Sequence, residues 1–214
     1  MPDPALDLTQ GAQTRLEAIA SEVRACVRCP LHLTRTNGVP GSGPATARIM
    51  AVGEAPGENE DRQGRPFVGA AGKLLTQLLE EIGLSREDIF ITNVLKSRPP
   101  GNRDPLPDEV LACAPYLDAQ IEVIRPEVIL VLGRHALQRL LPQAPGISRA
   151  HGTLIPWGGR TYMPCYHPAA ALYNGSLLAV LRQDFQRLQA HLAERPASAP
   201  PPVVPPAGEQ LGLF

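Results

Sequence analysis

The sequence contains no apolar run that approaches the roughly 18–20 residues needed to cross a bilayer. Its first ten residues, MPDPALDLTQ, have neither the basic start nor the apolar middle of a secretion signal. These two absences argue against membrane-anchored and secreted classes, and we expect a cytoplasmic protein. Only four cysteines occur, and in a reducing compartment they favour metal ligands or buried thiols over disulfides.

The sequence also has little net charge, because 20 basic and 21 acidic side chains leave −1 at neutral pH. No global basic field favours nucleic acid, so any contact with a polyanion must come from a local patch. Lysine is nearly absent, with only Lys73 and Lys96 in the chain. A hydrophobic content of 43% over 214 residues indicates a globular chain with a sizeable core.

Short apolar runs alternate with stretches of helical periodicity. Strands are expected within residues 47–53, 88–96 and 127–133, and in the pair 153–157 and 161–168, which a tight turn at Gly158-Gly159 joins. Helices are expected within residues 14–26, 69–83, 107–124, 134–142 and 176–194. This order predicts a three-layer α/β/α sandwich around a mostly parallel four-stranded sheet. Ligands of such folds bind beyond the carboxyl ends of strands, so we expect the site where loops begin near Gly53, Lys96 and His167.

The composition changes after residue 194, which we take as the end of the folded domain, 1–194. Residues 195–209 form a Pro/Ala-rich tract that cannot pack a core and is expected to be a flexible linker. Residues 210–214, QLGLF, form an apolar end, which is typical either of fraying or of a peptide for a partner's groove.

The loop GEAPGENEDRQGRPFVG is the densest polar feature, with Glu54, Glu58, Glu60 and Asp61 ahead of Phe67. On its own it is compatible with a strand-to-helix turn that carries solvated acids and a core phenylalanine. A dinucleotide site is disfavoured, because G-x-G-x-x-G does not follow the first strand.

Four motifs occur in order between about Leu16 and Leu192: GEAPGENED…GRPFVG, ITN, RPPGNR and YHPAA. Together they resemble the family 4 uracil-DNA glycosylases, the iron–sulfur members of the uracil-DNA glycosylase superfamily. The resemblance implies a repair enzyme that flips deoxyuridine out of DNA and hydrolyses the N-glycosidic bond to release uracil, initiating base excision repair. It further implies uracil-containing DNA as partner, a monomer, and a nucleoid-associated cytoplasmic location.

The resemblance assigns three residues to the substrate. Phe67 matches the phenylalanine that stacks on the base. Asn93 matches the asparagine that reads the uracil edge, because an amide offers a donor and an acceptor together to O4 and N3–H. Ala55 stands where the best-known family of the superfamily has its water-activating aspartate, in a loop that reads G-Q-D-P-Y.

Catalytic roles come from the same motifs. His167 matches the histidine beside uracil O2, where negative charge develops as the base departs. The carboxylate role falls to Glu54, expected to hold or polarise the water, and to Glu60, expected to support it. Asn102 of PPGNR also belongs to the family's functional set. The remaining histidines are taken as incidental: His32, His135, His151 and His191.

A metal site is implied by Cys26 and Cys29 of CVRCP together with Cys113. They match three of the family's four cluster ligands, and Ser97 stands at the expected fourth-ligand position. The resemblance thus implies a 4Fe–4S cluster with three cysteine ligands and either Ser97 or water as the fourth. Serine suits iron less well than a thiolate, so the cluster is expected to be labile or absent, with zinc as an alternative. Cys165 is expected in the pocket wall.

Two macromolecular contacts are expected besides the base pocket. A local positive set in the motif segment is expected to meet DNA phosphates: Arg62, Arg65, Lys73, Lys96, Arg98 and Arg103. The terminal QLGLF resembles the sliding-clamp-binding pentapeptide Q-L-[SD]-L-F of bacteria and departs from it at Gly212.

Two other functions stay open. Relatives that capture uracil-DNA covalently carry a basic insertion with an extra histidine, and no such insertion interrupts GNRDPLPDE. A DNA- or clamp-binding module without catalysis has its only support in Ser97.

Overall fold

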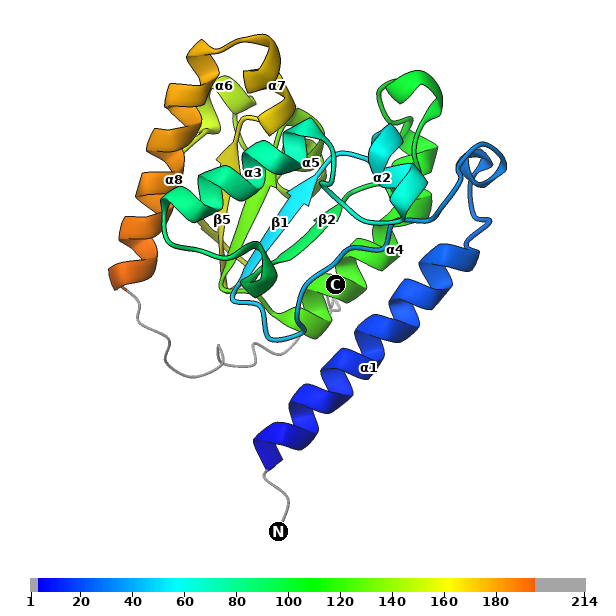
Figure 1. The fold of residues 1–214 in the computed structure, drawn as a ribbon. Coiled ribbons are helices and arrows are strands. Elements are labelled where there is room, and N and C mark those ends of the chain that lie inside the picture. Colours follow the sequence, from blue (N-terminus) through cyan, green and yellow to red (C-terminus); the bar gives the residue numbers. More distant parts are fainter. Residues whose placement is uncertain (1–3, 195–214) are drawn as a thin grey trace, which may run out of the picture.

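The structure, a computed structural model, describes residues 4–194; the expected linker at 195–209 and peptide at 210–214 lie outside them. A five-stranded sheet runs through the domain in the order β2-β1-β3-β5-β4 (Figure 1). Four strands are parallel: β1 (Ile49–Gly53), β2 (Phe90–Asn93), β3 (Val128–Leu132) and β5 (Arg160–Cys165). The edge strand β4 (Ile155–Trp157) pairs with β5 in the antiparallel direction.

Helices cover both faces of the sheet, which is why β1, β2 and β3 are buried along their whole length and why β1 and β3 are apolar throughout. Ile49 and Ala51 of β1 face a core that is closed by α3 (Ala70–Glu81), α7 (Pro168–Tyr173) and α8 (Ser176–Glu194). Met50 and Val52 face a second core on the opposite side. That core is closed by α1 (Pro4–Ala25), α4 (Pro107–Ile124), α5 (Arg134–Leu140) and α6 (Ile147–Ala150).

The expected α/β/α sandwich is confirmed, with one more strand than the expected four. The additional strand is β4, and the turn at Gly158-Gly159 joins it to β5 as expected. The α4 and α8 helices begin and end where their sequence patterns predict. Short elements escaped the sequence patterns because they span too few residues for helical periodicity: α2 (Glu58–Gln63), α6, α7, and the 3-10 helices Pro30–Leu33, Arg86–Asp88 and Pro100–Asn102.

Within residues 4–194, no helix combines the length and the apolar character that crossing a membrane requires.

The parallel register brings the carboxyl ends of four strands to one edge of the sheet. Gly53 at the end of β1 lies opposite Asn93 at the end of β2. Leu132 at the end of β3 lies opposite Cys165, two residues before His167. Loops that leave these strands must therefore share the same edge, where ligands of such folds bind.

Candidate active site

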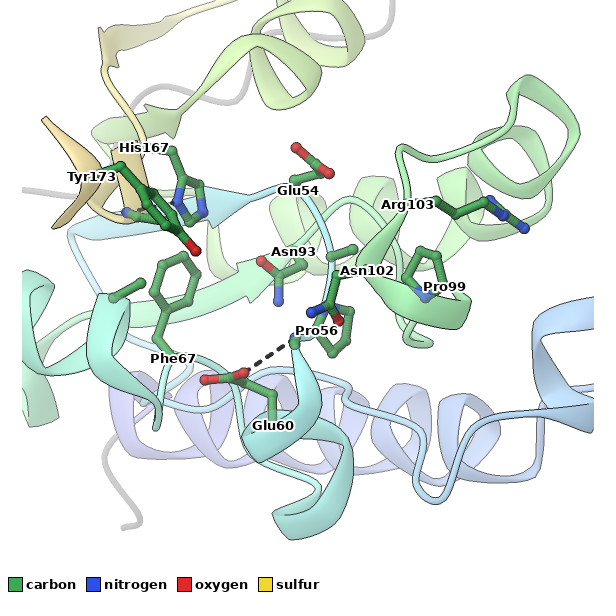
Figure 2. Close-up of a pocket in the computed structure, with 14 residues that line it drawn as sticks. Glu54, Pro56, Glu60, Phe67, Asn93, Pro99, Asn102, Arg103, His167 and Tyr173 are labelled. Atoms are coloured by element: carbon green, nitrogen blue, oxygen red, sulfur yellow. Dashed lines mark hydrogen bonds between the residues drawn. The ribbon is translucent and has the colours of Figure 1, made fainter. Parts of the chain in front are cut away.

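A cavity of about 440 Å³ opens at this edge, and Figure 2 shows the side chains that surround it. It brings together all seven residues to which the sequence assigned chemistry or base binding. Its lining consists of Glu54, Ala55, Pro56, Gly57, Glu60, Phe67, Ala71, Asn93, Pro99, Asn102, Arg103, His167, Ala169 and Tyr173.

The buried amide of Asn93 lies in the cavity wall, with only 2% of the residue exposed. Its Oδ1 atom has no hydrogen-bond partner within the described part of the chain. A buried acceptor without a partner is costly, by about 1–3 kcal/mol, and native structures rarely tolerate one outside a functional site. The cavity therefore offers an unused acceptor to a ligand's N–H group.

Phe67 forms a wall of the cavity and has a left-handed backbone conformation, which residues other than glycine rarely adopt. Its φ of 51° is left-handed, which costs roughly 1–2 kcal/mol for a residue with a side chain. Arg86 holds this turn by donating to the carbonyl oxygens of Phe67 at 2.9 Å and Pro66 at 2.6 Å. Gly72 must lack a side chain, because a Cβ there would lie 1.9 Å from the Phe67 oxygen. The ring consequently stacks beside His167, with centroids 5.6 Å apart.

Glu60 supports the same turn from the other side. Its carboxylate accepts hydrogen bonds from the backbone N–H groups of Val68 at 2.8 Å, Gly69 at 2.7 Å and Gly57 at 3.1 Å. The bond to Gly57 is the dashed line in Figure 2. Both carboxylate oxygens are thus engaged with backbone, which suits a residue that positions the loop better than one that polarises water.

His167 is a neutral donor at the cavity. Its Nδ1 accepts the backbone N–H of Ala169 at 3.2 Å, at the start of α7, so the ring proton sits on Nε2. Burial lowers the pKa of His167 to about 4. The imidazole is therefore uncharged at neutral pH, and no residue among 4–194 accepts a hydrogen bond from its Nε2–H group, which faces the cavity as a donor for a ligand.

Glu54 follows β1 and is half-buried, with 31% of its side chain exposed. No hydrogen bond joins its carboxylate to another described residue, in contrast to Glu60. Burial raises the pKa of Glu54, and the nearby Asp104 raises it further, while His135 and Arg134 lower it. An open carboxylate at the edge of the cavity is suited to hold a water molecule.

His135, which sequence reasoning took as incidental, is part of this site. Its Nε2 lies 3.7 Å from Glu54 Oε2 and 3.3 Å from Asp104 Oδ1. The residue comes three positions after Leu132, the last residue of β3. Its position just beyond the carboxyl end of a predicted strand is the sequence feature that indicates a site residue there.

Asn102 and Ala55 line the cavity, and contacts with neighbouring residues fix the position of each. The Asn102 backbone is left-handed, with φ 55°, and its Oδ1 accepts from Arg98 Nε at 2.8 Å. Ala55 also packs against an apolar cluster formed by Leu31, Leu95 and Cys113.

The basic residues that were expected to meet DNA phosphates do not form one surface in the structure. Lys96 is 1% exposed, so the expectation that it meets DNA phosphates is wrong. Its Nζ donates to Thr92 Oγ1 at 2.6 Å, to the Asn93 carbonyl at 2.8 Å and to Gln120 Oε1 at 2.8 Å. Arg65, Lys73 and Arg86 instead line a second cavity of about 330 Å³ that shares Phe67 with the first.

Comparison with known proteins decides the family. The family model described as the uracil DNA glycosylase superfamily matches residues 40–192. A type-4 uracil-DNA glycosylase of Saccharolobus solfataricus is 52% identical over 190 residues, covering 85% of this chain and 88% of the relative. This chain belongs to the type-4 uracil-DNA glycosylases. Another type-4 uracil-DNA glycosylase, from Thermotoga maritima, is 46% identical over 181 residues, 83% of this chain and 94% of the relative. A type-5 uracil-DNA glycosylase of Thermus thermophilus is 36% identical over 151 residues, 60% of this chain and 68% of the relative.

Three cysteines of this type-4 glycosylase converge beside the active-site loop. Cys26 and Cys29 follow α1, Cys113 lies in α4, and the three thiols interact electrostatically. Each sulfur accepts a backbone N–H group: that of Arg28 at 3.5 Å for Cys26 and that of Lys96 at 3.4 Å for Cys113. Burial raises the pKa of Cys29, and a backbone hydrogen bond from Leu31 offsets part of that rise. Such donors stabilise thiolates, so the three residues fit a metal-bound group.

The spacing of the sulfur atoms bears on the kind of metal. Within residues 4–194, three ligand atoms lie within 4.8 Å of one another only at Glu54, Asp104 and His135, and hence not at the three cysteines. Thiolates on one zinc ion, each about 2.3 Å from the metal, would stand about 3.8 Å apart. At least two of the three sulfur atoms therefore lie more than 4.8 Å apart, farther than one zinc ion would hold them.

Ser97, the residue at the expected fourth-ligand position, is engaged in another contact. Ser97 is buried, and its Oγ accepts from Arg35 Nη1 at 2.8 Å. The other end of the guanidinium donates to the Cys26 carbonyl at 2.9 Å. Cys165 is fully buried in the core beneath α8 and does not line the cavity, so the expectation that it forms the pocket wall is wrong.

Proposed function

We propose that this chain is a repair enzyme that flips deoxyuridine out of DNA and hydrolyses the N-glycosidic bond, so that uracil is released and base excision repair begins. The observation that carries the proposal is the unpaired Oδ1 of Asn93, buried beside the Phe67 ring in a cavity of the type-4 fold. Its type-4 relatives, which it matches over most of their length, carry the name uracil-DNA glycosylase.

Base recognition follows from the two side chains together. Flipping costs a few kcal/mol of unstacking, which contact with the Phe67 ring returns. The Asn93 Oδ1 accepts the uracil N3–H, and its Nδ2 donates to O4. Cytosine has no proton on N3 and carries an amine at C4, so it reverses both contacts and is rejected.

Bond cleavage uses donors and acceptors of this chain. As the bond between C1′ and N1 breaks, its electron pair passes to uracil and negative charge develops at O2. The His167 Nε2–H donates to that oxygen, and the neutral imidazole keeps its proton there. Glu54 polarises a water molecule, whose oxygen bonds to C1′ of the oxocarbenium-like sugar while the carboxylate accepts a water proton. Glu60 holds the Phe67 turn by accepting the backbone N–H groups of Val68 and Gly69.

Release of free uracil from a deoxyuridine-containing oligonucleotide is the direct test of this function. A covalent adduct between protein and DNA would instead identify a uracil-DNA-capturing enzyme. Binding with neither product would identify a non-catalytic module and contradict the proposal.

Substitution by glutamine is expected to separate the two glutamates. Glu54→Gln should slow single-turnover uracil release about 10²–10⁴-fold with the free energy of unfolding nearly unchanged. Glu60→Gln should lower the free energy of unfolding by about 1–3 kcal/mol, because an amide nitrogen replaces an acceptor of backbone N–H groups. Single-turnover assays and urea denaturation measure these quantities. Glu58→Gln, on the exposed side of α2, is the control. Undiminished excision by Glu54→Gln would contradict the carboxylate role of Glu54.

We further infer that Cys26, Cys29 and Cys113 hold a 4Fe–4S cluster, supported by their convergence and by the N–H donors to their sulfur atoms. When bound, the cluster would supply a cross-link between the segment after α1 and helix α4, with no part in bond cleavage. Because Arg35 already engages Ser97, we assign the fourth ligand to water, and such a site loses iron more readily.

Ser97→Cys is expected to strengthen cluster binding, because a thiolate suits iron better than a hydroxyl or water. Iron content and visible thiolate-to-iron absorption of anaerobically purified protein should then persist severalfold longer in air than in the wild type. Cys113→Ala should abolish both signals, and Cys165→Ala, outside the site, should leave them unchanged. Equal lifetimes for wild type and Ser97→Cys, or zinc in place of iron, would refute this assignment.

The C-terminal QLGLF, outside the described residues, is proposed to bind the bacterial sliding clamp behind the 195–209 linker, bringing a monomeric, nucleoid-associated enzyme to replicating DNA. Deletion of residues 210–214 should weaken clamp binding and leave uracil release from a free oligonucleotide intact. Unchanged affinity for the purified clamp would eliminate this role.

A further inference from the structure

Glu54 must hold one side-chain conformation if its carboxylate is to orient a water molecule. A glutamate side chain has three rotatable bonds, and fixing it in one rotamer costs on the order of 1.5–2 kcal/mol. In the described part of the chain its carboxylate makes no hydrogen bond, whereas Glu60 makes three. The nearest ionisable partner is His135, with Nε2 at 3.7 Å from Glu54 Oε2.

His135 reaches the site from the helix that follows β3. It lies at the start of α5, with 15% of its side chain exposed. Its Nε2 atom is shielded from solvent and makes no well-aligned hydrogen bond to any described residue. A buried ring nitrogen without an aligned partner is the arrangement expected when a hydrogen bond tightens only with substrate in place.

Asp104 faces the same nitrogen from the loop after the 3-10 helix Pro100–Asn102. Its Oδ1 lies 3.3 Å from His135 Nε2, and its other oxygen accepts from Arg134. That contact with Arg134 lowers the pKa of Asp104, so the carboxylate is ionised at neutral pH. The His135 Nε2 atom thus lies between the carboxylates of Glu54 and Asp104. The guanidinium of Arg134 supplies a positive charge beside these two carboxylates.

We propose that His135 is a positioning residue for uracil excision, whose Nε2–H bridges Asp104 and Glu54 and turns the Glu54 carboxylate toward the attacking water. The inference rests on the proposed function, because a fixed Glu54 matters only if water is activated there. It gives a role to the first turn of α5 in a chain where Ala55 occupies the place of the aspartate that activates water in the best-known family of the superfamily. A glutamate side chain has one more rotatable bond than an aspartate side chain. The contact with His135 restricts rotation about that additional bond.

The first test removes the N–H and then restores it. His135→Leu should slow single-turnover uracil release about tenfold, with affinity for the deoxyuridine oligonucleotide within about twofold of wild type. His135→Gln should recover most of the rate, because its amide nitrogen reaches a similar point. His191→Leu, on α8 and away from the cavity, is the matched control.

A double-mutant cycle decides whether His135 acts through Glu54. In a Glu54→Gln background, His135→Leu should cause no further loss, because residues that act as a unit are non-additive. An equal loss in both backgrounds would show an independent role and overturn the inference. So would a full rate for His135→Leu in protein whose urea denaturation matches wild type.

The pH profile supplies a second readout that a purely structural role would not move. Glu54 must be ionised to act, so the rate falls as pH drops through its pKa, which lies above the ordinary value. His135 lowers that pKa, so His135→Leu should move the acid limb to higher pH; Asp104 raises it, so Asp104→Asn should move the limb to lower pH. The other charged or titratable groups at the cavity are unchanged in both variants: Glu60, Arg103, Arg134, His167 and Tyr173.

The outcomes separate this inference from the function on which it rests. If wild-type protein releases no uracil, the proposed function fails. If wild type releases uracil and neither His135→Leu nor the acid limb differs from it, only the positioning role fails.

Discussion

The pairing of Gly53 with Asn93 across two parallel strands is the contact on which the rest of the site depends. A Cβ on Gly53 would lie 2.4 Å from Asn93 Oδ1 and 2.6 Å from Phe67 Cζ, so only glycine lets the amide and the ring meet there. For the ring to reach that point, the chain must turn through a left-handed Phe67. Backbone N–H groups of Val68 and Gly69 that donate to Glu60 stabilise the turn, and bonds to a charged acceptor contribute about 1.5–3 kcal/mol each.

The cysteine site and the active site share one apolar cluster without sharing chemistry. Ala55 lines the cavity and also packs on the cluster that contains Leu31, Leu95 and Cys113. Lys96, adjacent to Ser97, donates to the carbonyl of Asn93 and so fixes the backbone of the base-reading residue. A structural change at the cysteine site therefore reaches the cavity through the packing of Ala55 and the backbone position of Asn93.

Local periodicity predicted the sandwich and most of the long helices, and the resemblance carried by the motifs named seven of the residues that line the cavity. Neither could predict that Lys96 is buried, since Thr92 and Gln120 come from separate elements to satisfy its ammonium group. The contact between His135 and Glu54 was missed for the same reason: residues 81 positions apart meet only through strand order. The bond between Arg35 and Ser97 likewise depends on how the loop after α1 folds back.

Binding of free bases to the wild-type protein, without DNA, tests most directly whether the cavity is already built to read uracil. Isothermal titration with uracil and with cytosine measures this in one experiment. With Asn93 presenting its unpaired acceptor beside Phe67, uracil should bind at least about tenfold more tightly than cytosine, because a mismatched edge leaves buried polar groups unpaired. Equal affinities for the two bases would contradict a preformed, Asn93-centred uracil pocket.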